Sequence, residues 1–279
     1  MVPLTRYDRL SCEIAIWAEV ILKHGLTAFD AQRAADLPLA SPSDLATRWD
    51  LPVWAVKRTI DRLRAETILS AFAPDPGLYH ILKPRRFLAG LTTRITRRLG
   101  SPVTVALPPA LRGKATQDIL ADISNALSTV LVRGDQPSLA ILHSAFAIET
   151  PHIARAQVYK GPGPLTLTLT THSLNAVEKT LNLARLKSPR RRPSKENPLG
   201  LPEGFAYADL LVFARRPDVS LWAEFGPYAR NSLSTAGLHP LNPFVNALLL
   251  SLFPIRGEEA AERLIDTLRK HLEQEERKE

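Results

Sequence analysis

The sequence has a single cysteine, Cys12, among its 279 residues. One thiol excludes an internal disulfide and any metal site built from several cysteines, and it fits a reducing compartment. No apolar run approaches the roughly 20 residues that a membrane-spanning helix needs. The N-terminal stretch carries acidic residues within its apolar part, unlike a signal peptide. We therefore expect a cytoplasmic protein that has no membrane partner.

Motifs of catalysis and cofactor binding are also missing. The seven histidines form no HExxH or HxH pattern and no cluster with Cys12, which argues against a metal site. There is no GxSxG nucleophile elbow, no P-loop and no GxGxxG. Cys12 lies in an apolar helical pattern, where a thiol is usually buried and inert. We expect no catalytic residue, no metal site and no cofactor.

What the sequence does contain is an uneven basic excess. Lys and Arg outnumber Asp and Glu by 36 to 28, for a net charge of +8. Residues 1–113 hold 16 basic and 10 acidic side chains, whereas residues 114–279 hold 20 and 18. A basic excess favours an acidic partner such as nucleic acid. The hydrophobic content of 45% is that of a chain with a buried core.

The first 52 residues predict a series of helices. Apolar side chains recur at helical spacing up to Gly25, namely Leu10, Ile14, Trp17, Val20 and Ile21. A second helix is expected over residues 27–37, before Pro38. Ser41 should cap a third helix, with Pro42 at its first position and Asp44 completing a capping box. Pro52 then opens a fourth helix at a permitted position.

The fourth helix has two different faces. Val53, Val56, Ile60 and Leu63 share one face by their spacing. A rotation of about 100° per residue places Trp54, Arg58 and Arg62 nearly opposite, with Lys57 and Arg64 on the flanks. Two short β-type runs follow, joined by a Pro74–Gly77 turn, and predict a hairpin. Helix, tight turn, helix and hairpin is the order of a winged helix-turn-helix, whose second helix enters the DNA major groove.

We therefore expect double-stranded DNA as a partner of this domain. The candidate contacts are Ser43, Thr47, Arg48, Trp54, Lys57, Arg58, Arg62, Arg64, Lys83, Arg85 and Arg86. The last three begin a basic segment, residues 83–98, that is suited to phosphate contacts. Other interpretations stay open, because a basic stripe is commonly a solvated face and winged helices also bind proteins. Trp54 has the alternative of covering the domain's own surface, and residues 83–98 that of an ordinary connecting helix.

The predicted fold class is α+β. Residues 1–100 are expected to form a helical extension and the winged helix-turn-helix, and residues 101–279 an α+β domain with a helical C-terminus. A short strand is expected over Val103–Leu107, and leucines alternate with threonines over residues 165–170 as in a half-exposed strand. Residues 208–231 are strongly apolar and fit either two helices or two buried strands. Arg190–Arg192 lie in a proline-rich basic loop.

One pair of acids suggests an alternative. If residues 208–213 and 220–225 are adjacent strands, Asp209 and Glu224 resemble the two acids of the PD-(D/E)xK nuclease fold, which bind a divalent metal that activates water. That family also needs a lysine two residues after the glutamate, and this chain has Gly226 there. Ordinary surface acids are the preferred interpretation. The alternative function is a mobile-element or replication-associated protein with a winged helix and a degenerate nuclease-like domain.

Another resemblance covers both domains. A winged helix joined to an α+β domain of this size resembles the AbiEi-type antitoxin regulators of type IV toxin–antitoxin systems. The similarity is strongest in LPEGFAYADLLVFARRPDVSLWAEFGPYARNSL, where that family typically has a Leu-rich helix, an Arg-Pro break and a tryptophan followed by an acid. The matching positions are Leu210–Arg215, Arg216-Pro217, Trp222 and Glu224. The Arg190–Arg192 loop and the helical extension depart from the pattern.

The resemblance implies a function. Such regulators bind operator DNA ahead of their own genes and oppose a nucleotidyltransferase-like toxin. This chain lacks the Gly-Ser…Asp-x-Asp pattern of that toxin class, so it is not the toxin. We expect a sequence-specific, non-enzymatic transcriptional regulator, an antitoxin-like autorepressor, with the toxin as a protein partner. Absence of DNA affinity at low salt would indicate a protein-interaction scaffold instead. The sequence defines neither the operator nor the oligomeric state.

Overall fold

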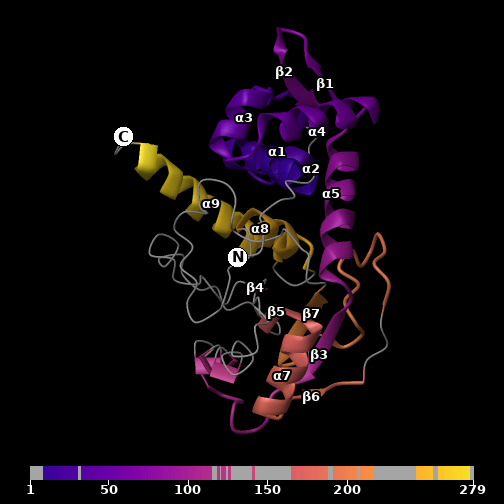
Figure 1. The fold of residues 1–279 in the computed structure, drawn as a ribbon, viewed down its shortest axis with the longest axis vertical. Coiled ribbons are helices and arrows are strands. Elements are labelled where there is room, and N and C mark those ends of the chain that lie inside the picture. The colour runs from indigo at the N-terminus through magenta and orange to yellow at the C-terminus, as the bar shows by residue number, and fades with distance from the viewer. Residues whose placement is uncertain are drawn as a thin grey trace. The chain divides into compact units, whose positions relative to one another are not determined.

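The computed structural model describes residues 9–30, 33–114, 118–119, 121–123, 125–126, 140–141, 165–187, 191–205, 208–215, 243–253 and 257–276. Helices and strands both occur among these residues and do not alternate regularly, so the predicted α+β class is confirmed (Figure 1). Two compact units are present. The first comprises Met1–Ile95, Ala223–Arg230 and Glu262–Glu279, and the second comprises Thr96–Trp222 and Asn231–Ala261. None of the described helices combines the length and apolarity required to cross a bilayer.

Helix α1 (Arg9–His24) forms the centre of the first unit. Every residue from Leu10 to Ile21 is buried, so the helix is surrounded by protein on all sides. It ends as predicted at Gly25, whose φ of 77° lies in the left-handed region that glycine adopts without strain. Cys12 is buried within it.

The helix predicted over residues 27–37 is wrong in its extent. The structure has two short pieces instead, α2 (Thr27–Asp30) and the 3-10 helix η1 (Arg33–Asp36). Among the described residues of this stretch only Ala28, Phe29 and Ala34 are buried. Most helical stability in proteins comes from packing an apolar face. The small buried surface of this stretch therefore does not support a longer helix.

The predicted cap and corner before the fourth helix are confirmed. Helix α3 (Pro42–Arg48) begins at Ser41, whose Oγ accepts a hydrogen bond from the Asp44 backbone N–H at 3.2 Å and donates to the Asp44 carboxylate at 2.7 Å. After α3 the chain turns at Asp50, with φ 50°. Helix α4 (Val53–Ala65) then begins directly after Pro52.

The buried face of α4 is rotated from the predicted one. Ala55, Val56, Thr59, Ile60 and Leu63 are buried, whereas Val53, predicted to face inward, is 39% exposed. The centre of the buried face lies between the directions of Val56 and Thr59. At about 100° per residue this places Val53 roughly a quarter turn away, at the edge of the core.

The predicted hairpin is present, with a different turn. Strand β1 (Leu69–Phe72) pairs antiparallel with β2 (Asp75–Ile81), Leu69 opposite Ile81 and Phe72 opposite Asp75. The chain therefore reverses at residues 73–74 and not over the predicted Pro74–Gly77. A register shift between Ala71 and Phe72 leaves residues 76–78 of β2 without a paired residue on β1.

Helix α5 (Pro84–Leu99) follows the hairpin. Phe87, Leu91, Ile95 and Leu99 recur every four residues and are buried, which is the spacing of one helix face. The Phe87 ring stacks on Phe29 of α2 with centroids 6.2 Å apart. The boundary between the two compact units falls after Ile95, within this helix. The predicted domain division at residue 100 stays a prediction.

The second unit contains a five-stranded mixed sheet in the order β4-β5-β7-β3-β6. Its strands are Pro102–Ala106 (β3), Ala140–Ile141 (β4), Leu165–Thr170 (β5), Ala184–Arg185 (β6) and Leu210–Arg215 (β7). β5 and β7 are parallel, and the other neighbours are antiparallel. Helix α7 (Thr171–Leu181) contributes Leu174 and Val177 to a core that includes Val105, Leu210 and Val212. Helices α8 (Pro243–Ser251) and α9 (Gly257–Glu276) complete the described chain.

Strand β7 differs from the helix that the resemblance implies at this position. Residues Leu210–Arg215, which correspond to the Leu-rich helix typical of AbiEi-type regulators, form a strand. It lies between β5 and β3, and Leu210, Leu211, Val212 and Phe213 are all buried. A strand covered on both faces has a continuous apolar run, so its sequence lacks the alternation that would separate it from a helix. The strands predicted at Val103–Leu107 and at residues 165–170 are confirmed as β3 and β5.

Candidate nucleic-acid interface

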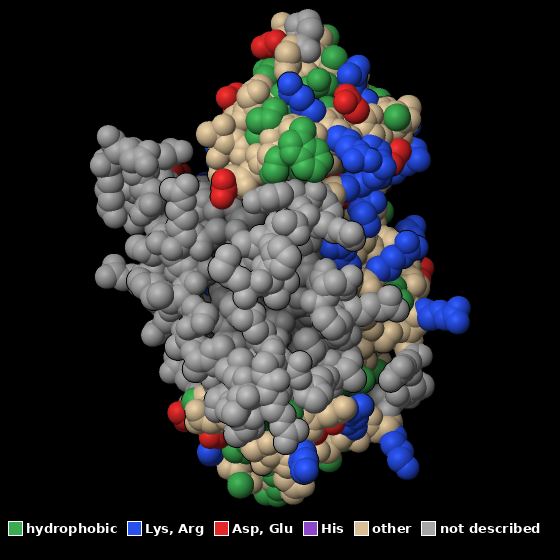
Figure 2. All heavy atoms as spheres, viewed as in Figure 1, with side chains coloured by type: hydrophobic (Ala, Val, Ile, Leu, Met, Phe, Trp, Pro, Cys, Tyr) green, Lys and Arg blue, Asp and Glu red, His purple; other side chains and the backbone are tan. Residues whose placement is uncertain are grey.

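The outer face of α4 is basic and exposed. It carries Trp54, Lys57, Arg58, Arg62 and Arg64, and Trp54 is 63% exposed. Among the described residues Lys57, Arg58 and Arg62 form no ion pair, so their charges are turned outward. Figure 2 shows Lys and Arg side chains gathered over α4 and α5. A surface of this kind attracts polyanions.

The hairpin is fixed to α4 and to the chain before α3. The Arg64 guanidinium lies over the Tyr79 ring of β2, 5.7 Å from its centroid, and 3.9 Å from the Asp61 carboxylate. The Tyr79 carbonyl accepts a hydrogen bond from the Leu39 N–H at 2.7 Å. These contacts give α4 and the hairpin a common orientation.

Three predicted contacts lie just after the hairpin. Lys83 donates from Nζ to Thr67 Oγ1 at 2.8 Å, which places its ammonium beside the end of α4. Arg85 and Arg86 are exposed in the first turn of α5. Among the described residues these two arginines form no ion pair, so they extend the basic face of α4.

The predicted contacts on α3 divide into two kinds. Ser43 and Thr47 are exposed, and among the described residues their hydroxyls have no hydrogen-bond partner; the Ser41–Asp44 cap beside them does not involve them. Arg48 is half exposed, but its Nη1 donates to both carboxylate oxygens of Glu19 at 2.7 and 2.8 Å. Glu19 lies on α1, is 3% exposed and also accepts the Trp49 Nε1–H at 2.9 Å. Arg48 therefore holds α3 on α1.

A second buried glutamate connects α1 to α5. Glu13 of α1 is fully buried and is paired with Arg9 and with Arg94 of α5, whose Nε lies 2.6 Å from Glu13 Oε2. Arg9 also forms a bidentate pair with Glu66 at 2.6 and 2.7 Å. Burial raises the pKa of the Glu13 carboxyl, and the two arginines act in the opposite direction. The hydrogen bonds from Arg9 lower the pKa of Glu66.

This arrangement removes one arginine from the basic segment 83–98. Arg94 points inward to Glu13, so it is a packing residue and not a free phosphate contact. Glu13 and Glu19, the buried partners of Arg94 and Arg48, were not predicted from the sequence. Both acids lie among apolar positions of one predicted helix. Because a buried charge requires a partner, this pattern could have indicated that each glutamate pairs with a basic residue.

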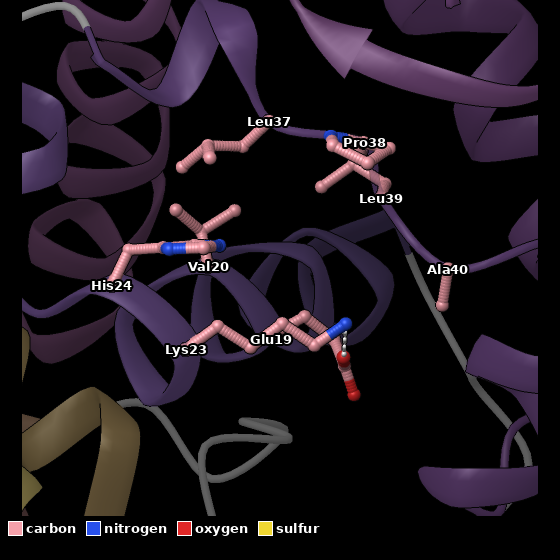
Figure 3. A pocket seen from close by; sticks show the side chains of 8 residues that line it. All are labelled: Glu19, Val20, Lys23, His24, Leu37, Pro38, Leu39 and Ala40. Carbon is pink, nitrogen blue, oxygen red and sulfur yellow. Dashed lines mark ion pairs between the residues drawn. The ribbon is translucent and has the colours of Figure 1, made fainter.

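A small hollow lies between α1 and residues 37–40. It is lined by Glu19, Val20, Lys23 and His24 on one side and by Leu37–Ala40 on the other (Figure 3). The Lys23 Nζ lies 3.7 Å from the Glu19 carboxylate beside this hollow. Burial, followed by the charges of Lys23 and Arg269, lowers the pKa of His24. The space leaves no room for even a water molecule, so it is packing and not a ligand site.

Asp209 has partners that do not suit a metal ligand. Its Oδ2 accepts the Leu107 backbone N–H at 2.8 Å and Arg112 Nε at 3.2 Å. The carboxylate thus connects the start of β7 to the chain after β3. No group of three or more His, Cys, Asp or Glu side chains suited to a metal occurs among the described residues. Trp222, Glu224 and Gly226 lie outside the described residues, so the nuclease-like pair is not observed.

The Arg190–Arg192 loop is described in part. Arg191 pairs with Glu203 at 3.1 Å, and Arg192 is exposed. Arg190 lies outside the described residues. Of the three arginines, Arg191 therefore forms an ion pair within the second unit.

No protein-family model, curated protein or solved structure matches this chain. The basic face of α4 and the start of α5 are thus defined by their own geometry and charge.

Proposed function

We propose that the protein is a sequence-specific DNA-binding transcriptional regulator that uses α3, α4 and the β1–β2 hairpin as a winged helix-turn-helix. The observation that carries this proposal is the outer face of α4, whose Lys57, Arg58 and Arg62 are exposed and without an ion-pair partner among the described residues. Helix, turn, helix and hairpin occur in the order that such domains require.

The side chains divide by position into two roles. Arg58 lies on the outer side of α4, where a helix in the major groove meets base edges. Arg62 lies at the edge of that side, about a quarter turn from the centre of the buried face. Lys83, Arg85 and Arg86 flank that face and supply phosphate contacts, which add affinity without sequence information. Arg48 is committed to Glu19 and positions α3.

The biological setting we propose is an antitoxin-like autorepressor in the cytoplasm, with a nucleotidyltransferase-like toxin as protein partner. This part rests on the order of the domains in the AbiEi-type regulators. Because Leu210–Arg215 is a strand, the Leu-rich motif gives it no support. Co-expression with a neighbouring toxin gene tests it: rescue of growth is expected, and unchanged toxicity contradicts the partner but leaves DNA binding unaffected.

The test of DNA binding is a fluorescence-anisotropy titration with a duplex selected by the wild-type protein from a random-sequence pool. Arg58→Ala and Arg62→Ala should each weaken binding by about 1–3 kcal/mol if they contact bases. Lys270→Ala on α9 removes the same charge from an exposed position and should leave the affinity unchanged. Affinity should also fall steeply with salt, because bound counterions are released. Wild-type affinity in both α4 variants would contradict the proposed interface.

A further inference from the structure

Trp54 is the most exposed large apolar side chain in the described part of the molecule. Its exposed fraction is 63%, whereas Trp17 and Trp49 are 1% and 0% exposed. Its ring contacts no other aromatic ring and no cation among the described residues. Val53 beside it is 39% exposed. The first turn of α4 therefore presents an apolar spot that the fold does not use.

The surroundings of this spot narrow what it can contact. Trp54 lies opposite the centre of the buried face of α4, and Lys57 and Arg58 lie one turn further along the same side. The one acid on this side of the described helix, Asp61, lies two turns along and is paired with Arg64. A partner that fits must offer an apolar group at its centre and negative charge on either side. A protein groove lined with leucines would meet uncompensated cations here.

The DNA major groove has this combination. Thymine presents its 5-methyl group on the groove floor, and the phosphates run along both edges. The N-terminal residues of a recognition helix contact the base edges. Tryptophan has one N–H donor and no acceptor, so the large apolar face of the indole is what it brings to the groove.

We propose that Trp54 is a specificity-determining residue that packs against the 5-methyl group of thymine in the major groove. This inference rests on the proposed DNA binding and adds the feature of the base that is read. Arg58 and Arg62 then supply charge and hydrogen bonds next to an apolar reading position.

The experiment compares two forms of one duplex. The duplex is selected by the wild-type protein from a random-sequence pool and is then synthesised with thymine or with deoxyuridine, which differs only in lacking the methyl group. One buried methyl group corresponds to roughly a fourfold change in affinity, so the wild-type protein should bind the thymine form at least that much more tightly. Trp54→Ala should bind both forms equally. Its thermal unfolding by far-ultraviolet circular dichroism should match the wild type, because the side chain is exposed.

Two controls separate this inference from the function on which it rests. Leu186→Ala removes an apolar side chain that is 40% exposed in the second unit and should keep the preference for thymine. Arg58→Ala should bind both forms more weakly while keeping their ratio. If the wild-type protein binds no duplex at low salt, the proposed function fails and this inference with it. If the wild type binds but does not distinguish the two forms, or if Trp54→Ala still distinguishes them, DNA binding stands and the role of Trp54 is wrong.

Discussion

Arg269 of α9 donates a hydrogen bond from Nε to the backbone carbonyl of Leu22, 247 residues earlier, at 2.6 Å, and its Nη2 lies 3.2 Å from the Ile21 carbonyl. The last carbonyls of a helix have no partner within it, and its C-terminal end attracts positive charge. Arg269 thus caps α1 within the first unit. Charged hydrogen bonds of this kind stabilise a fold by about 1–3 kcal/mol.

We predict that Arg269→Ala lowers the free energy of unfolding by about 1–2 kcal/mol, since the side chain is partly exposed. The same change should raise the pKa of His24, because the charge of Arg269 is one of the causes that lower it. Urea denaturation measures the first effect, and NMR titration of the imidazole measures the second. Lys270→Ala is the matched control. An unchanged His24 titration would show that Arg269 does not lie against the end of α1.

Removal of the Glu13 charge should be more damaging. Glu13→Gln leaves Arg94 without its carboxylate and removes one partner of Arg9. We expect a loss of about 3 kcal/mol, the lower end of the usual cost of breaking a buried pair, because Arg9 keeps Glu66. Glu262→Gln makes the same change at an exposed position of α9 and should have little effect. Equal denaturation midpoints for the two variants would contradict the structural role of Glu13.

Acid stability should depend on Glu66. Its pKa is lowered in the folded protein, mainly by the hydrogen bonds from Arg9. The stability it contributes is fully present above the unfolded pKa of about 4.3 and is lost as pH falls through the lower folded value. Glu66→Gln should therefore be less stable than wild type at neutral pH, and the difference should shrink below about pH 4. Urea unfolding across that range measures it, and a constant difference would assign the effect to another group.

Asp209 should behave as a structural residue. Asp209→Ala leaves the Leu107 N–H and Arg112 without their shared acceptor, and we expect a loss of about 1–2 kcal/mol. Magnesium or manganese should not raise the melting temperature of the wild-type protein. Plasmid cleavage that depends on either metal and disappears in Asp209→Ala would revive the nuclease-like alternative.

Local patterns predicted the local parts of the fold. The Ser41 cap, the end of α1 at Gly25 and the basic outer face of α4 each depend on residues within one or two turns of one another. The partners of Glu13 and Glu66 could not be predicted in this way. Arg94 lies 81 residues from Glu13, and Arg9 lies 57 residues from Glu66, so neither pairing leaves a periodic signal.

Two features were ambiguous in the residues themselves. The apolar run of β7 fits a buried helix as well as a central strand, and its neighbours β5 and β3 decide between them. The hairpin turn was assigned to Pro74–Gly77 from its composition, but the register shift after Ala71 moves the reversal to residues 73–74. The pairing of Arg48 with Glu19 was not predicted, because Glu19 belongs to another helix.

The complete burial of Leu10–Ile21 in α1 determines which part of the chain tolerates change least. From Leu10 to Ile21 there is no solvent-facing position at which a larger or charged side chain could be accommodated. A saturation mutagenesis scan should therefore find this stretch among the least permissive in the protein, although by sequence it looks like an appendage in front of the first recognisable motif. Homologues should vary more at the exposed face of α4 than along this helix.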